Sequence, residues 1–124
     1  MQLLLEKSSF TTEISLGNVS AKVTLNVVDA SSIQTIVDKH TKTKYKQGVK
    51  KETMDHIAIR AERFCKILED WEDITDRTGK AIPCTYENKK KIADLNFDFV
   101  QAIFDAAEGY GQTLNEEEIK KAGN

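Results

Sequence analysis

The 124-residue sequence has few of the residues that build metal centres and disulfide frameworks: one proline, two cysteines and two histidines. Cys65 and Cys84 form no CxxC pair, so we expect neither a metal site nor a disulfide framework. The apolar runs are far shorter than the roughly 20 residues that span a bilayer, so no membrane association is expected. The N-terminus lacks the basic start and apolar stretch of a secretory signal, which predicts a cytoplasmic protein.

The sequence also lacks a catalytic constellation. Neither His40 nor His56 stands beside a serine or cysteine in a nucleophile motif, and no glycine-rich phosphate loop opens a predicted helix. An acidic cluster lacks the spacing of a calcium loop, and we interpret it as a solvated helix end, with a surface for a basic partner as the alternative. Its members are Glu69, Asp70, Glu72, Asp73 and Asp76. We therefore predict a protein that is not an enzyme, with no catalytic residue, cofactor or metal.

The length predicts a single domain over residues 1–124. Apolar and polar residues alternate from Thr12 to Val28 around Gly17-Asn18, which predicts a β-hairpin with one half-buried face. A short helix capped by Asp29 or Ser31 completes a β-rich N-terminal part, residues 1–38. The fold class that we predict is α+β, with this small antiparallel sheet followed by three main helices.

The helical core is expected over residues 52–110. Apolar residues recur at helical spacing from Ile57 to Trp71, which predicts a central helix over Glu52–Asp73. Thr85 is positioned to cap a second helix, and a third is expected to end at Gly109 and Gly111. We expect residues 111–124 to form a frayed tail, because they offer little apolar surface to bury.

A lysine-rich segment, residues 39–51, contains no acidic residue. Its basic residues are Lys39, Lys42, Lys44, Lys46, Lys50 and Lys51. We interpret the segment as a mobile surface linker, because its charge is dense and it has few apolar anchors. A nucleic-acid contact is the alternative, although the net charge of −2 and the single aromatic residue, Tyr45, do not favour it.

The stretch Trp71–Asn88 has an unusual order of features. A tryptophan at the end of a predicted helix is followed by an Asp-Gly turn, then by an apolar-Pro pair, and then by the capped start of the next helix. The residues that carry this order are Trp71, Asp76, Gly79, Pro83, Thr85 and Asn88. In this order the chain resembles the small tail assembly chaperones of long-tailed bacteriophages and prophages. The likeness extends over roughly residues 55–108, whereas the N-terminal hairpin and the lysine-rich segment match no signature of that family.

The resemblance implies a non-catalytic assembly factor in the cytoplasm of an infected or lysogenic bacterium. Such proteins bind the aggregation-prone tape measure protein, help to recruit tail tube subunits and are lost from the finished virion. The implied partners are therefore the tape measure and tube proteins, and a homo-oligomer is compatible with this role. Two other hypotheses stay open: a nucleic-acid-binding accessory protein that uses Lys39–Lys51, and a small structural or adaptor protein of a phage.

Overall fold

The computed structural model describes residues 5–6 and 8–122, and from residue 110 onward it describes the backbone alone. Three strands form an antiparallel sheet in the order β1-β2-β5: β1 (Ser9–Leu16), β2 (Val19–Asn26) and β5 (Leu68–Glu72). Two others form a separate hairpin: β3 (Thr41–Lys46) and β4 (Val49–Met54). The helices are α1 (Ala30–Lys39), α2 (His56–Ile67), α3 (Tyr86–Leu95) and α4 (Phe97–Ala122). The fold is α+β, as predicted.

The N-terminal β-hairpin confirms the alternating pattern seen in the sequence. β1 pairs with β2 around Gly17, whose φ of 61° suits the turn. Ile14, Val23 and Leu25 are buried on the inner face, while Glu13 and Lys22 are exposed on the outer one. α1 follows directly with Asp29 as its N-cap residue, as expected.

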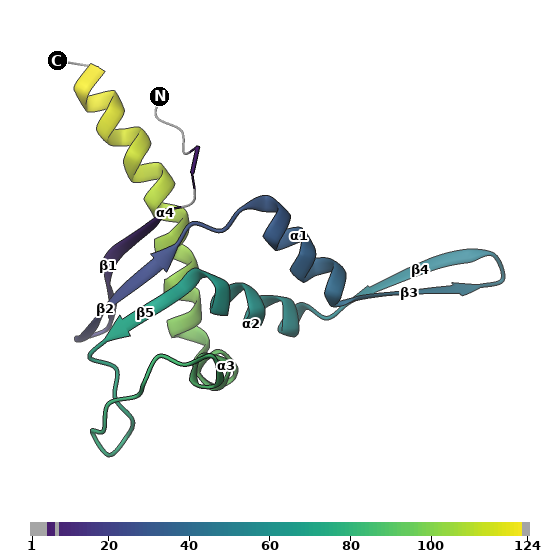
Figure 1. Ribbon diagram of the computed structural model, residues 1–124, viewed down its shortest axis with the longest axis horizontal. Coiled ribbons are helices and arrows are strands. Elements are labelled where there is room, and N and C mark those ends of the chain that lie inside the picture. Colours follow the sequence, from purple (N-terminus) through teal and green to yellow (C-terminus); the bar gives the residue numbers. More distant parts are fainter. Residues whose placement is uncertain (1–4, 7, 123–124) are drawn as a thin grey trace.

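The hydrophobic core lies between this sheet and the helices α2 and α4. In Figure 1, α4 passes behind the sheet, and α3 lies nearly end-on below it. Phe64 of α2 is fully buried and meets Phe99 of α4 edge to face, with ring centroids 6.1 Å apart. Val100 and Ile103 add the buried face of α4. The C-terminal helix thus covers the inner face of the N-terminal hairpin.

The predicted helix over Glu52–Asp73 is wrong at both ends. α2 begins at His56 and ends at Ile67, and the chain then continues as β5, which pairs with β2. The pairing skips Glu69, so a β-bulge turns both Leu68 and Trp71 toward the core. The bulge places the two buried residues of the strand, Leu68 and Trp71, three positions apart. This spacing is also typical of one face of a helix, so the sequence pattern predicted a helix here.

The prediction of a mobile linker over residues 39–51 is also wrong. The segment begins with the last residue of α1 and then forms the β3–β4 hairpin, which Figure 1 shows projecting away from the rest of the fold. Gln47 and Gly48 turn the chain with φ values of 53° and 80°, as a two-residue hairpin turn requires. Alternation of lysine with threonine or tyrosine along β3 was the strand signal that the dense charge obscured.

The prediction that a helix ends at Gly109 and Gly111 is wrong, because α4 continues through both to Ala122. Glycine costs a helix interior about 1 kcal/mol, and with no proline nearby that is too little to end it. Residues 111–122 of the predicted frayed tail continue this helix, while residues 123–124 lie outside the described residues. Within the part of the chain that the structure describes, no helix is both long enough and apolar enough to cross a bilayer.

Candidate functional site

Trp71 anchors the segment that carries the resemblance, residues 71–88, which we call the Trp71–Asn88 loop. The indole ring is 7% exposed and belongs to the main core cluster. Its Nε1 donates a hydrogen bond of 2.7 Å to the carbonyl oxygen of Ile82. Because Ile82 lies eleven residues further along the chain, this bond ties the second half of the loop to β5.

The Asp76-Gly79 turn is held by the Asp76 carboxylate. Its Oδ1 accepts hydrogen bonds from the backbone N–H of Thr78 at 2.8 Å and of Lys80 at 3.1 Å, and from the Thr78 hydroxyl. These bonds, the Thr78 hydroxyl first, hold the pKa of Asp76 below its ordinary value. Gly79 has a φ of 85°, a conformation that favours glycine. The turn is thus fixed from within.

The end of the Trp71–Asn88 loop becomes the start of α3. The Thr85 hydroxyl accepts from the backbone N–H of Asn88 at 3.2 Å, which confirms Thr85 as the cap. The Asn88 side chain in turn donates to the carbonyl oxygen of Pro83 at 2.9 Å. These two hydrogen bonds fix the end of the loop to the start of α3. The motif residues therefore determine the conformation of the loop.

An apolar groove of about 700 Å³ lies between the Trp71–Asn88 loop, the turn end of the β1–β2 hairpin, and α3 and α4. Asp73 is the one charged residue among those that line it. Leu16 and Val19 stand at the hairpin turn and are 37% and 69% exposed. The lining residues are Ile14, Leu16, Asn18, Val19, Ser20, Ala21, Asp73, Ile74, Thr75, Ile82, Ile92, Asn96 and Phe99.

Sequence reasoning missed the groove. Its walls come from three separated parts of the chain, and the one local signal was a pair of apolar residues, Leu16 and Val19, directly beside a Gly-Asn turn. Apolar side chains next to an exposed turn are not needed to build the turn. Their exposure leaves apolar surface at the rim of the groove.

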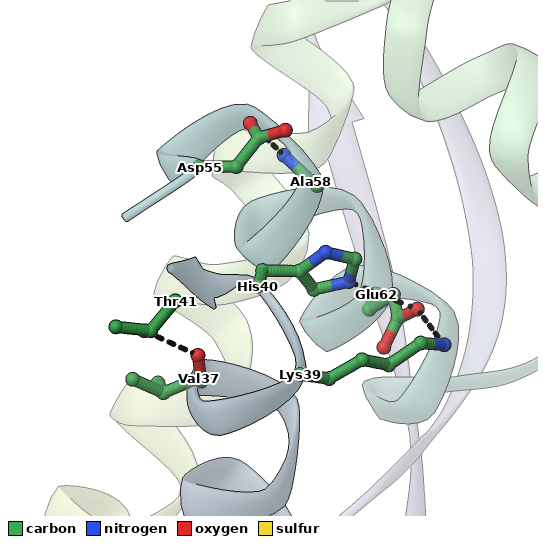
Figure 2. Close-up of polar contacts among 7 residues, drawn as sticks. All are labelled: Val37, Lys39, His40, Thr41, Asp55, Ala58 and Glu62. Carbon is green, nitrogen blue, oxygen red and sulfur yellow. Dashed lines mark hydrogen bonds and ion pairs between the residues drawn. The ribbon is translucent and has the colours of Figure 1, made fainter. Parts of the chain in front are cut away.

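The β3–β4 hairpin is fixed at its base by contacts with α1 and α2 (Figure 2). The backbone N–H of Asp55 donates to the His40 carbonyl at 2.9 Å, and the Asp55 carboxylate caps α2 by accepting from Ala58 at 3.1 Å. Glu62 of α2 meets Lys39 Nζ at 2.7 Å and His40 Nε2 at 3.1 Å. Lys39, and then His40, hold the pKa of Glu62 below its ordinary value. The hairpin therefore leaves the body in a defined direction.

The six predicted basic residues do not act as one group. Lys39 lies in α1 and is paired with Glu62, and Lys50 lies 3.0 Å from Glu52. The strand register places the other four on one face of the hairpin, with Lys44 directly opposite Lys51. We call this the lysine face, and it consists of Lys42, Lys44, Lys46 and Lys51.

The fold does not bring the acidic cluster or the two cysteines into a metal or nucleophile site among the described residues. Among the residues with described positions, no group of three or more histidine, cysteine or acidic side chains could hold a metal ion. The acidic cluster lies on β5 and in the loop after it, so the predicted helix end is wrong. Cys65 and Cys84 form no disulfide, and burial raises the pKa of both thiols, which makes them poor nucleophiles.

Comparison with known proteins adds one match. The searches of curated proteins and of solved structures found no match to the chain. A family model described as "YdaY prophage protein" matches residues 30–124, a range that includes the β3–β4 hairpin, the Trp71–Asn88 loop and α4. Because that match extends over most of the sequence, the chain belongs to the YdaY family of prophage proteins.

Proposed function

We propose that this prophage protein is a non-catalytic tail assembly chaperone. In this role it binds the tape measure protein and helps to recruit tail tube subunits in the host cytoplasm, and it leaves before the virion is complete. The observation that carries the proposal is the Trp71–Asn88 loop. Its sequence resembles that of such chaperones, and it is held in place by Trp71 and lines one wall of an apolar groove.

The groove suits an apolar segment of a partner. Its rim residues Leu16 and Val19 keep much of their surface in contact with solvent, and Asp73 is its one charged lining residue. Covering an apolar side chain of this size contributes up to about 1.5 to 3 kcal/mol. A tape measure protein would supply such segments along its length, and a chaperone that covers them would keep it from aggregating.

The proposal is tested by co-expression with the tape measure protein of the same prophage. We expect the tape measure to stay soluble and to co-purify with the wild-type chain. Replacing both rim residues, by Leu16→Gln and Val19→Gln, should weaken this capture about tenfold or more, since most of the apolar contact at the rim is lost.

Val49→Gln is the matched control. Val49 is 67% exposed and begins β4 directly after a turn, just as Val19 is 69% exposed and begins β2 after a turn. This control should retain full capture, and circular dichroism should show all variants folded. A tape measure that is equally insoluble with and without the protein, together with failed capture of both tape measure and tube proteins, would refute the chaperone function in favour of an adaptor role.

A further inference from the structure

We propose that the lysine face of the β3–β4 hairpin binds the phosphate backbone of double-stranded DNA without sequence preference. This inference does not depend on the chaperone function, because the hairpin lines no part of the apolar groove. The four side chains concerned are Lys42, Lys44, Lys46 and Lys51. Together with Thr53, three of them line a shallow hollow of about 200 Å³ on the hairpin.

The lysine face is not balanced by acidic side chains. None of its four ammonium groups pairs with a carboxylate among the residues that the structure describes, and Glu52 lies on the opposite face beside Lys50. Lys44 directly opposes Lys51, an arrangement of like charges that destabilises a strand pair. A bound polyanion would relieve this repulsion.

The hairpin also separates its positive charge from the acidic remainder of the chain. Outside residues 39–51, which hold six lysines and no acid, 12 basic residues face 20 acidic ones. Strands of six residues are about 20 Å long, whereas the Debye length at physiological salt is about 8 Å. The lysines near the tip therefore act largely independently of the acidic body, which Figure 1 shows lying at the other end of the hairpin.

The residue types favour duplex DNA over other anionic partners. Protein interfaces are depleted in lysine and rely on tyrosine, tryptophan and arginine. Single-stranded nucleic acid is held by aromatic side chains that stack on its bases, but Tyr45 lies on the face opposite to the lysines. A two-stranded β-ribbon is narrow enough to lie along the groove of B-DNA, and lysine contacts with phosphates, made as a point charge, carry no sequence information.

The contacts at the base of the hairpin support this role. Thr41 opens β3 and donates from its hydroxyl to the Val37 carbonyl at 2.6 Å, and Glu62 ties Lys39 and His40 to α2 (Figure 2). A ribbon held in this way presents its lysines in one orientation. Less conformational freedom is then lost on binding than in a mobile basic tail.

The test is fluorescence anisotropy of the full chain with a short labelled duplex of mixed sequence. Four phosphate contacts predict a slope of about −3.6 when the logarithm of the association constant is plotted against the logarithm of the salt concentration. Binding should then be about 150-fold weaker at 200 mM than at 50 mM salt. The double variant Lys44→Gln and Lys51→Gln should halve the slope to about −1.8. It should remain folded, because it removes a repulsive pair.

Two comparisons separate this proposal from a general charge effect. Lys80→Gln with Lys91→Gln removes the same charge from exposed positions off the hairpin and should leave the slope unchanged. Lys44→Arg with Lys51→Arg should retain binding. The proposal is overturned by the absence of binding at low salt, by equal losses in the two glutamine variants, or by polyglutamate or single-stranded DNA competing as well as the duplex.

Discussion

Trp71 is predicted to be the main structural anchor of the Trp71–Asn88 loop, and two substitutions separate its two contributions. Trp71→Ala removes a ring that is 7% exposed and also its hydrogen bond to Ile82. Truncating a buried aromatic side chain costs about 3 to 5 kcal/mol of unfolding free energy. Trp71→Phe keeps most of the apolar volume but leaves the Ile82 carbonyl without its indole donor, for which we expect a loss of about 1 to 3 kcal/mol.

The measurement is urea unfolding followed by far-ultraviolet circular dichroism, because Trp71 is the single tryptophan and its fluorescence disappears in both variants. Ile57→Ala is the surface control, since Ile57 is 80% exposed, and it should change stability by about 0.5 kcal/mol or less. A loss below about 1 kcal/mol for Trp71→Ala would refute the reasoning. The ring would then belong to a binding surface and not to the core.

Two further predictions concern the loop and the base of the hairpin. Thr85→Ala removes the side chain that caps α3 and should lower the unfolding free energy by about 1 kcal/mol in the same urea assay, whereas Thr85→Ser should restore most of it. Lys39 and His40 lower the pKa of Glu62 in the folded state. The Glu62 carboxylate therefore stabilises the fold fully above about pH 4.5, and this stabilisation is lost as the pH falls through the folded pKa. Urea unfolding at several pH values should show stability falling on acidification, and Glu62→Gln should make that fall shallower. A pH profile that Glu62→Gln leaves unchanged would contradict the stabilising role of the Glu62 pairs with Lys39 and His40.

Local signals in the sequence were sufficient for the N-terminal hairpin and for the helix caps. Alternation around Gly17-Asn18 determined β1 and β2, Thr85 marked the start of α3 through its capping hydroxyl, and Asp29 marked the start of α1 as its N-cap residue, without a side-chain cap hydrogen bond. Each of these features depends on residues that are close in sequence. The secondary structure could therefore be predicted from the sequence wherever residues close in sequence determine the backbone conformation.

The errors arise where tertiary pairing decides. β5 has a helix-like apolar spacing because a bulge at Glu69 lets Leu68 and Trp71 face the same core, and the pairing with β2 selects the strand. The lysines of β3 obscured a strand whose alternation and Gln47-Gly48 turn were present in the sequence. The apolar groove was missed for the same reason, since its walls meet only in the folded chain.

The central claim is that the protein has two separate binding surfaces, the apolar groove for tail proteins and the lysine face for DNA. The most direct test measures both activities on the same two variants: capture of the tape measure protein and affinity for duplex DNA. We predict that the groove variant, Leu16→Gln with Val19→Gln, loses capture but binds DNA normally. The lysine-face variant, Lys44→Gln with Lys51→Gln, should bind DNA more weakly, with about half the wild-type salt slope, but retain capture. Loss of both activities in each variant, or of neither, would contradict the claim.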